Sequence, residues 1–365
     1  MLMKYIRKYV EKNLFVNDLL RRTLFFKYNS KISQYVSEIS EVDSIENFND
    51  FRKIVNQCPP NILNSAYTLK RAYAENTSYG YATSLMRYAN LQNENILYLP
   101  LLEHGIVLHS LGIDFGRYNP NMSYIFQGRS SEALWKNRKF FRPIYYIGPY
   151  VHYAEDYYEQ HRVKQIKSRN RSTLLIFPPH SSEFESSEFV YESFSHFLFD
   201  TIAKKYNTIY ACVFWRDANS KYTKFLDAQG VKIVSAGFKI DPKFVCRLRT
   251  IISLSDCVIY PAFTTSIGYA YYLNKRIICV DNEKNINWRC DWSKERQNRM
   301  THNFSNVMNY LSTIFNYYSD DDEKIKNERE NFIEKFWGIK EIKTPEEIRS
   351  IYFENKKYII KNLGF

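Results

Sequence analysis

The sequence lacks the features that would place a protein across a membrane or outside the cell. It has no apolar run long enough to cross a bilayer, which takes about 20 consecutive apolar residues, and no short hydrophobic signal-peptide core near its start. Its six cysteines form no C-x-x-C pair. We therefore expect a cytoplasmic protein whose cysteines are reduced and packed as small apolar side chains.

Signatures of nucleic-acid-binding folds are missing as well. There is no zinc-finger spacing, no RNP-type aromatic motif and no helix-turn-helix with a clear basic recognition face. The formal net charge of +12 nevertheless favours an acidic partner. Nucleic acid is the weakest candidate, so we expect none bound. The charge instead favours an anionic membrane surface or a phosphorylated substrate.

A basic amphipathic pattern occupies the first thirty residues. Apolar side chains recur there close to helical spacing, with lysines and arginines between them. One interpretation is a helix packed on the first domain with a solvated basic face. The other is an interfacial helix that holds the protein against anionic lipid, peripheral on the inner face of the cytoplasmic membrane. The sequence leaves both open.

The length of 365 residues predicts two domains, because single cores stop growing beyond roughly 250–300 residues. We expect an N-terminal α/β domain over residues 1–160, a Rossmann-like domain over 161–340, and a C-terminal helix over 341–365 that crosses back to the first domain. The charged segment 155–172 has no useful apolar face, so it is the candidate interdomain connection.

The second half carries the clearer structural pattern. Short apolar runs alternate there with helical stretches, which predicts a parallel, doubly wound sheet. The predicted strands are 173–177, 208–215, 231–235, 257–260 and 276–280, with helices near 189–205, 221–229, 242–253 and 266–273. In the first half, residues 95–102 are predicted as a strand that ends at Glu103, and a second strand is predicted within 139–151.

Polar residues at strand ends are the candidates for function. In a parallel α/β sheet, ligands bind outside the carboxyl ends of the strands, near the point where the strand order reverses. Four segments lie at such ends: Glu103–Gly105, Pro179–Ser182, Trp215–Asp217 and Phe263–Ser266.

Each of three segments suggests a chemical role. Thr264–Ser266 opens a predicted helix, where hydroxyls and backbone N–H groups can hold a phosphate, although Ser and Thr also cap helices without any ligand. His180 can donate a hydrogen bond or a positive charge to a phosphate leaving group, or can simply be an exposed loop residue. Glu103 suits a general base, or a carboxylate that only stabilises a turn.

Taken together, these motifs resemble bacterial transferases that use CMP-activated acidic sugars, the sialyltransferases and the Kdo transferases of capsule and lipopolysaccharide assembly. The residues that carry the resemblance are Glu103-His104-Gly105, His180 and Thr265-Ser266. Two positions depart from that pattern: His104 stands in place of an acid, and Ser181 rather than proline follows His180. The resemblance implies a GT-B-like α/β fold with two Rossmann-like domains facing across a cleft.

The resemblance also implies a reaction, which is inverting transfer of a sugar from a CMP-activated donor to a hydroxyl of a surface glycan or lipid-linked glycan. Glu103 would be the base, while His180 and the Thr265-Ser266 pair would contact the donor phosphate. The full set of candidate substrate- and nucleotide-binding residues is His104, Gly105, Ser181, Ser182, Arg216, Thr264, Thr265 and Ser266.

No DxD-type pair stands clearly at a strand end, so we expect a metal-independent reaction with no cofactor besides the nucleotide-sugar co-substrate. Two alternatives stay open. A CDP-alcohol phosphotransferase of the teichoic-acid type would use His104, rather than Glu103, as the base. A non-catalytic member of a polysaccharide assembly complex would bind a nucleotide without turnover.

Overall fold

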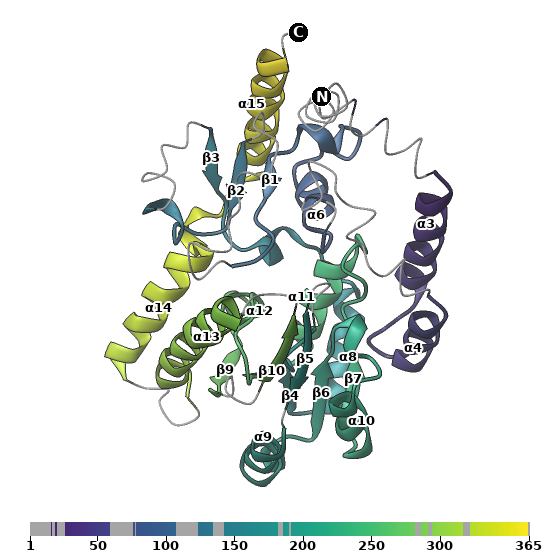
Figure 1. Ribbon diagram of the computed structural model, residues 1–365, viewed down its shortest axis with the longest axis vertical. Coiled ribbons are helices and arrows are strands. Elements are labelled where there is room, and N and C mark those ends of the chain that lie inside the picture. The colour runs from purple at the N-terminus through teal and green to yellow at the C-terminus, as the bar shows by residue number, and fades with distance from the viewer. Residues whose placement is uncertain are drawn as a thin grey trace.

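The computed structural model of the chain describes residues 16, 19, 26–58, 76, 78–106, 123–133, 142–181, 185–189, 191–281, 286–290, 294–316 and 322–363. Most of the predicted N-terminal basic helix lies outside these residues, as does the candidate site residue Ser182. The described residues form an α/β fold with two parallel sheets, a larger one below and a smaller one above in Figure 1.

The larger sheet has five parallel strands in the order β7-β6-β4-β8-β9. They are β4 (Thr173–Ile176), β6 (Thr208–Cys212), β7 (Lys232–Val234), β8 (Cys257–Tyr260) and β9 (Arg276–Cys279). All five were predicted, because strands covered on both faces read as nearly continuous apolar runs. The prediction of a parallel α/β sheet in this half is confirmed.

The helices predicted between the strands of the larger sheet are present as α9 (Glu192–Phe197), α10 (Lys221–Ala228), α11 (Phe244–Leu254) and α12 (Ser266–Tyr272). Two others, α8 (Gln160–Asn170) before β4 and α13 (Lys294–Ile314) after β9, were not predicted. A short π-helix (Leu198–Ile202) and a 3-10 turn (Ala203–Lys205) continue α9. The segment predicted as the interdomain connection contains α8, which buries only Ile166 and Asn170. Its narrow buried face explains why no apolar stripe was visible.

A separate pair of antiparallel strands, β5 (Glu185–Phe189) and β10 (Ile286–Cys290), was not predicted. The sequence of β5, ESSEF, has neither an apolar run nor a regular alternation of apolar and polar residues. Pairing with a strand about 100 positions later is a long-range event, and a local pattern carries no sign of it.

The smaller sheet has three short parallel strands, β1 (Leu101–Leu102), β2 (Tyr124–Phe126) and β3 (Ile144–Tyr146). The predicted strand over 95–102 is therefore too long. The Asn95 side chain accepts a hydrogen bond from the Leu97 N–H, and residues Ile96–Tyr98 form a 3-10 turn before the strand begins. Side-chain capping by Asn competes with extended backbone in this way.

The last helix, α15 (Pro345–Leu363), lies against the smaller sheet (Figure 1). Its fully buried Asn355 donates to the Tyr98 carbonyl at 2.7 Å and accepts from the Ser123 backbone N–H at 3.2 Å. Asn355 therefore ties the helix to the segments that lead into β1 and β2. Also in this half are α6 (Tyr81–Tyr88) and the 3-10 turn Tyr150–Tyr153.

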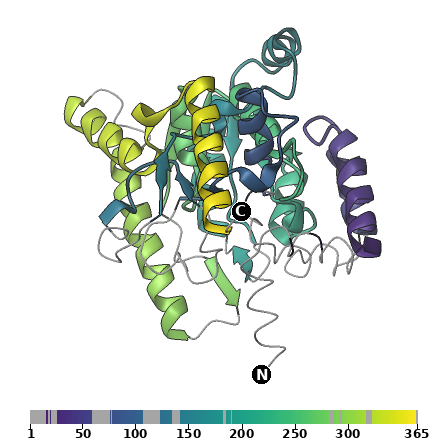
Figure 2. The ribbon, with the colours of Figure 1, turned by 90° about the horizontal axis from the view of Figure 1, so that it is seen from above.

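Two further helices, α3 (Phe26–Glu41) and α4 (Phe48–Gln57), precede the smaller sheet in sequence but pack on the larger one. Buried Phe48 and Phe51 of α4 share a core with Leu174 and Ile176 of β4. Seen from above, α3 lies on the opposite side of the molecule from α14 (Glu323–Trp337) (Figure 2). The division of the chain at residue 160 stays a prediction, and these helices belong by packing to the larger sheet.

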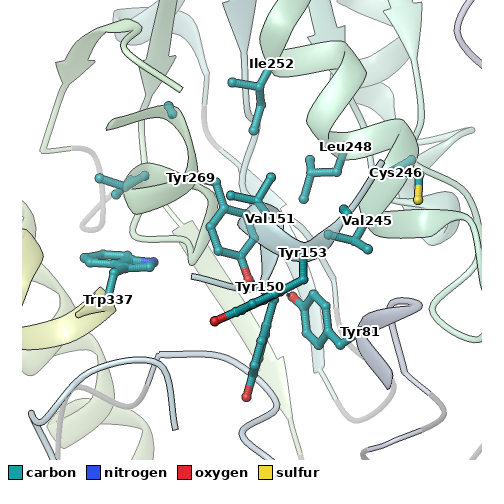
Figure 3. Packing of buried hydrophobic residues seen from close by; sticks show 14 of the residues in the cluster. Tyr81, Tyr150, Val151, Tyr153, Val245, Cys246, Leu248, Ile252, Tyr269 and Trp337 are labelled. Atoms are coloured by element: carbon teal, nitrogen blue, oxygen red, sulfur yellow. Dashed lines mark hydrogen bonds between the residues drawn. The ribbon is translucent and has the colours of Figure 1, made fainter. Parts of the chain in front are cut away.

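The other face of the larger sheet shares one apolar core with the smaller half. Leu175 and Val258 contribute to this core from the larger sheet, and Leu102 and Ile125 from the smaller one. Between them, Tyr81 and Tyr150 lie close to Tyr269 of α12 (Figure 3). The two halves are therefore joined through buried side chains. Among the described helices, none combines the length and apolar character needed to span a membrane.

A buried ion pair between Asp241 and Arg247 fixes the start of α11. Both side chains are fully buried. Arg247 also donates to the Ser40 carbonyl at 2.9 Å and to the Ile39 carbonyl at 3.3 Å, at the end of α3. The pair thus links α11 to the N-terminal helices. Breaking a buried ion pair on one side costs about 3–5 kcal/mol, because the other charge is left uncompensated.

We expect Arg247→Met to lower the free energy of unfolding by about 3–5 kcal/mol, since it leaves Asp241 buried without a counter-charge. Urea denaturation monitored by circular dichroism measures this. The matched control is Arg52→Met, which removes the partly exposed ion pair to Asp227 at 3.4 Å and should cost below about 1 kcal/mol. Equal effects from the two variants would contradict the assigned role of the buried pair.

Candidate functional site

The strand order of the larger sheet defines where a ligand should bind. The chain runs outward from β4 to β6 and β7 on one side, and then returns to β8 and β9 on the other. The order therefore reverses between β4 and β8, and the region beyond their carboxyl ends is the usual ligand site of such a sheet. Phe177 extends this pairing past the strands. Its N–H donates to the Ile259 carbonyl at 3.1 Å, and its ring stacks on Tyr260.

The loop after β8 carries the hydroxyl cluster predicted to bind phosphate. The Thr264 and Ser266 hydroxyl oxygens lie 3.3 Å apart, and Ser266 is buried at the start of α12. The Thr265 hydroxyl oxygen accepts the backbone N–H of Ile106 at 3.1 Å. Thr265 therefore reaches across to the loop that follows β1.

That loop holds the segment Glu103–Gly105, and the two predicted motifs meet there. A Cβ atom at position 105 would lie 2.9 Å from the Thr265 hydroxyl oxygen, so glycine permits the close approach of the loop. The motifs are about 160 positions apart in sequence, and each follows a different sheet. Their contact places the strand ends of both halves in one site.

Glu103 is the buried member of its motif, with 8% of its surface exposed. One carboxylate oxygen accepts the Gln127 backbone N–H at 3.1 Å. Burial raises the pKa of Tyr81 to about 12, with a smaller contribution from the negative charge of Glu103. Burial likewise raises the pKa of Tyr150 and of Tyr269. These tyrosines therefore stay protonated near neutral pH.

His104, in contrast, is exposed. Its Nε2 lies 3.3 Å from the Tyr79 hydroxyl, and the two rings are 5.0 Å apart. Tyr79 adopts a left-handed backbone with φ of 57°, and its carbonyl accepts the Val245 N–H of α11. The loop of the smaller half is thus held against α11 beside His104. Of the two candidate bases, His104 is the one that faces solvent.

His180 and Ser181 lie on the loop after β4. The His180 ring is exposed and packs against Phe214 at 5.2 Å, and its Nδ1 lies 3.0 Å from the Ser181 carbonyl. Ser181 is buried, and its hydroxyl donates to Asp217 at 2.7 Å. The guanidinium of Arg216 lies over the Trp215 ring at 4.9 Å. In the described part of this loop, His180 is therefore accessible to a ligand.

Two residues of this site were missed as functional candidates. Asp217 accepts both donors of Ser181, and the only sign of it in the sequence was its place at a strand end. Trp337, at the end of α14, donates its indole N–H to the Thr265 carbonyl at 2.9 Å. The indole is fully buried and fills the space left by Gly268 of α12, where a Cβ would lie 2.2 Å away. Nothing in the sequence near Trp337 indicates this contact.

The residue after Trp337 reaches the smaller half. Gly338 has a left-handed backbone with φ of 60°, and a Cβ there would lie 2.6 Å from the Gln127 carbonyl oxygen. Gln127 in turn donates its N–H to Glu103. Trp337 therefore contacts the turn that carries Thr265, and Gly338 contacts the loop after β2, whose Gln127 N–H is bound by Glu103.

Metal binding has no visible basis in the part of the chain described. No group of three or more His, Cys, Asp or Glu side chains within it is arranged to hold a metal ion. Near the switch point, His180 and Arg216 lie close to the Asp217 carboxylate.

Comparisons with known proteins give little more. No family model matches the chain, and no curated protein matches it significantly. Among solved structures, the wall teichoic acid polymerase TagF matches with a TM-score of 0.37 and 13% sequence identity. The match covers 71% of this chain and 65% of that one. A likeness this distant identifies neither the detailed fold nor the activity.

We expect Gly268→Ala to lower the free energy of unfolding by about 1–3 kcal/mol, because the added methyl group overlaps the Trp337 indole. Urea denaturation of Gly268→Ala, Trp337→Ala and the double variant measures the coupling. The double variant should cost less than the sum of the two single variants, since removal of the indole relieves the overlap. Simple additivity would mean that the two residues do not act on each other.

Proposed function

We propose that the chain is a metal-independent inverting glycosyltransferase, which binds a nucleotide-activated sugar beyond β4 and β8 and an acceptor hydroxyl beside β1. The observation that carries the proposal is the contact between Gly105–Ile106 and Thr265. It brings the loop that carries Glu103 in one half against the Thr265 hydroxyl at the start of α12 in the other. Glycosyl transfer from a phosphate-activated donor needs a base on the acceptor side of the reacting carbon and hydrogen-bond donors on the leaving-group side. The two loops carry the candidates for these two roles.

In this reaction the acceptor oxygen attacks the anomeric carbon of the donor, and its proton passes to Glu103. The bond between that carbon and the phosphate oxygen breaks, and the nucleotide leaves with the electron pair. His180 and the Thr264–Ser266 hydroxyls stabilise the departing phosphate by hydrogen bonds and, for a protonated His180, by charge. One displacement inverts the anomeric centre. The motif resemblance favours a CMP-linked acidic sugar as donor and a surface glycan as acceptor.

The exposure of His104 favours a second candidate, a CDP-alcohol phosphotransferase. Glu103 is buried and engaged by Gln127, whereas His104 faces solvent beside the Tyr79 hydroxyl. With His104 as the base, an acceptor hydroxyl would attack the distal phosphorus of the donor. The bond from that phosphorus to the bridging oxygen would break, and CMP would leave. Both candidates use the same nucleotide site and differ in the base and in the atom attacked.

In a thermal-shift titration with CMP, CDP, UDP, GDP and UMP, we expect CMP or CDP to raise the melting temperature most, since a ligand that binds only the folded chain stabilises it. Glu103→Gln should keep this shift and lose transfer at least 100-fold, as removal of a general base costs on the order of 10²–10⁴. His180→Ala should weaken both nucleotide binding and transfer.

The control is His104→Ala, which separates the two candidates. Transfer that survives His104→Ala and fails in Glu103→Gln supports the glycosyltransferase. The reverse result supports the phosphotransferase. A chain that responds to none of the five nucleotides would contradict both enzymes.

A further inference from the structure

Asp217 uses both of its carboxylate oxygens to bind the loop that carries His180. One of its carboxylate oxygens accepts the Ser181 backbone N–H at 2.8 Å, and the other accepts the Ser181 hydroxyl at 2.7 Å. Asp217 lies just after β6, and Ser181 lies in the loop after the neighbouring strand β4. The carboxylate therefore fixes one loop of the switch point from the adjacent strand.

The backbone of Asp217 is itself held in place from the far side. Its carbonyl accepts the Thr223 hydroxyl at 2.6 Å, and Thr223 belongs to α10. Ser220 caps that helix by accepting the Thr223 N–H at 3.1 Å. Asp217 is thus anchored to a helix, and the loop of Ser181 is anchored to Asp217.

Burial shows that this carboxylate is costly to maintain. Burial raises the pKa of Asp217, while the two hydrogen bonds from Ser181 and the nearby His180 and Arg216 lower it in part. A buried carboxylate persists only where hydrogen bonds compensate its lost hydration. An amide in its place has a single acceptor oxygen and could accept only one of the two Ser181 donors. A carboxylate is therefore the group that holds both donors of Ser181 at once.

We propose that Asp217 is a positioning residue of the donor site, which holds the His180–Ser181 loop in the geometry that meets the donor phosphate. The inference rests on the proposed function and adds a residue to it. Ser181 acts here as the link between Asp217 and His180, so its hydroxyl serves the loop and not the phosphate directly. Asp217 touches no substrate and works through the adjacent His180.

Steady-state kinetics of Asp217→Asn and Ser181→Ala test this. We expect each variant to lower kcat/KM for the donor by about 10- to 100-fold, which is the effect of losing a hydrogen bond to a charged group. The KM for the acceptor should not change, because the acceptor lies beside β1. Both variants disrupt the hydrogen bond between the Ser181 hydroxyl and residue 217. The double variant should therefore be no less active than the less active of the two single variants. Ser181→Thr retains both donors and should restore activity.

The matched control is Asp227→Asn, which removes an exposed carboxylate of α10 that pairs with Arg52 across 3.4 Å. It should leave donor and acceptor kinetics unchanged. Circular dichroism and the urea midpoint establish whether each variant is folded. If Asp217→Asn is unfolded, the kinetics of Ser181→Ala test the proposal.

The outcomes separate this inference from the function on which it rests. Wild-type protein that responds to CMP, with Asp217→Asn and Ser181→Ala indistinguishable from it, would overturn the positioning role and leave the transferase intact. Additive losses, or equal losses for donor and acceptor, would also overturn it. Wild-type protein that binds no nucleotide would overturn the proposed function, and this inference with it.

Discussion

Thr265 joins its turn to the smaller half through its side chain and to α14 through its backbone. Its hydroxyl oxygen accepts the Ile106 N–H of the smaller half, and its carbonyl oxygen accepts the Trp337 indole N–H. Glycine at position 105 allows the first contact, and glycine at position 268 allows the second. If Thr265 moved, the loop after β1 and the end of α14 would both lose a hydrogen-bond partner. The geometry of the candidate site therefore depends on this one turn.

The shared apolar core explains why this contact is held firmly. Tyr269, four residues after Thr265, donates its hydroxyl to Tyr81 of α6 at 3.3 Å. Both rings lie beside Tyr150 in one buried cluster (Figure 3). The same buried side chains therefore support the functional loops of both halves. A shared buried core resists small independent shifts of either half, which suits a site assembled from both.

Much of the larger sheet was predictable because its strands are buried on both faces. Apolar runs such as CVIY of β8 mark such strands directly, and the strand-end rule then located Thr265 and His180. The smaller sheet was harder, because its strands have only two or three residues and Asn95 caps a turn where a strand was predicted. Strands of two or three residues are too short to show an alternating pattern of apolar and polar side chains.

The supporting residues could not be found from sequence. The contact of Asp217 with Ser181 spans 36 positions, and that of Trp337 with Thr265 spans 72. Neither pair has a spacing that a helix or strand repeats. The contact of the Glu103–Gly105 loop with Thr265 spans about 160 positions, and no local pattern in the sequence indicates it. Which of Glu103 and His104 faces solvent depends on the loop conformation, and the sequence holds no signal for it.

Hydrogen–deuterium exchange of the wild-type chain, with and without saturating CMP, tests the two-sided site most directly. The account predicts slower exchange on CMP binding in three separate segments, 101–106, 177–181 and 261–268. The first belongs to the smaller half and the others to the loops after β4 and β8. Protection confined to one half, or to segments away from these loops, would contradict a site built from both halves.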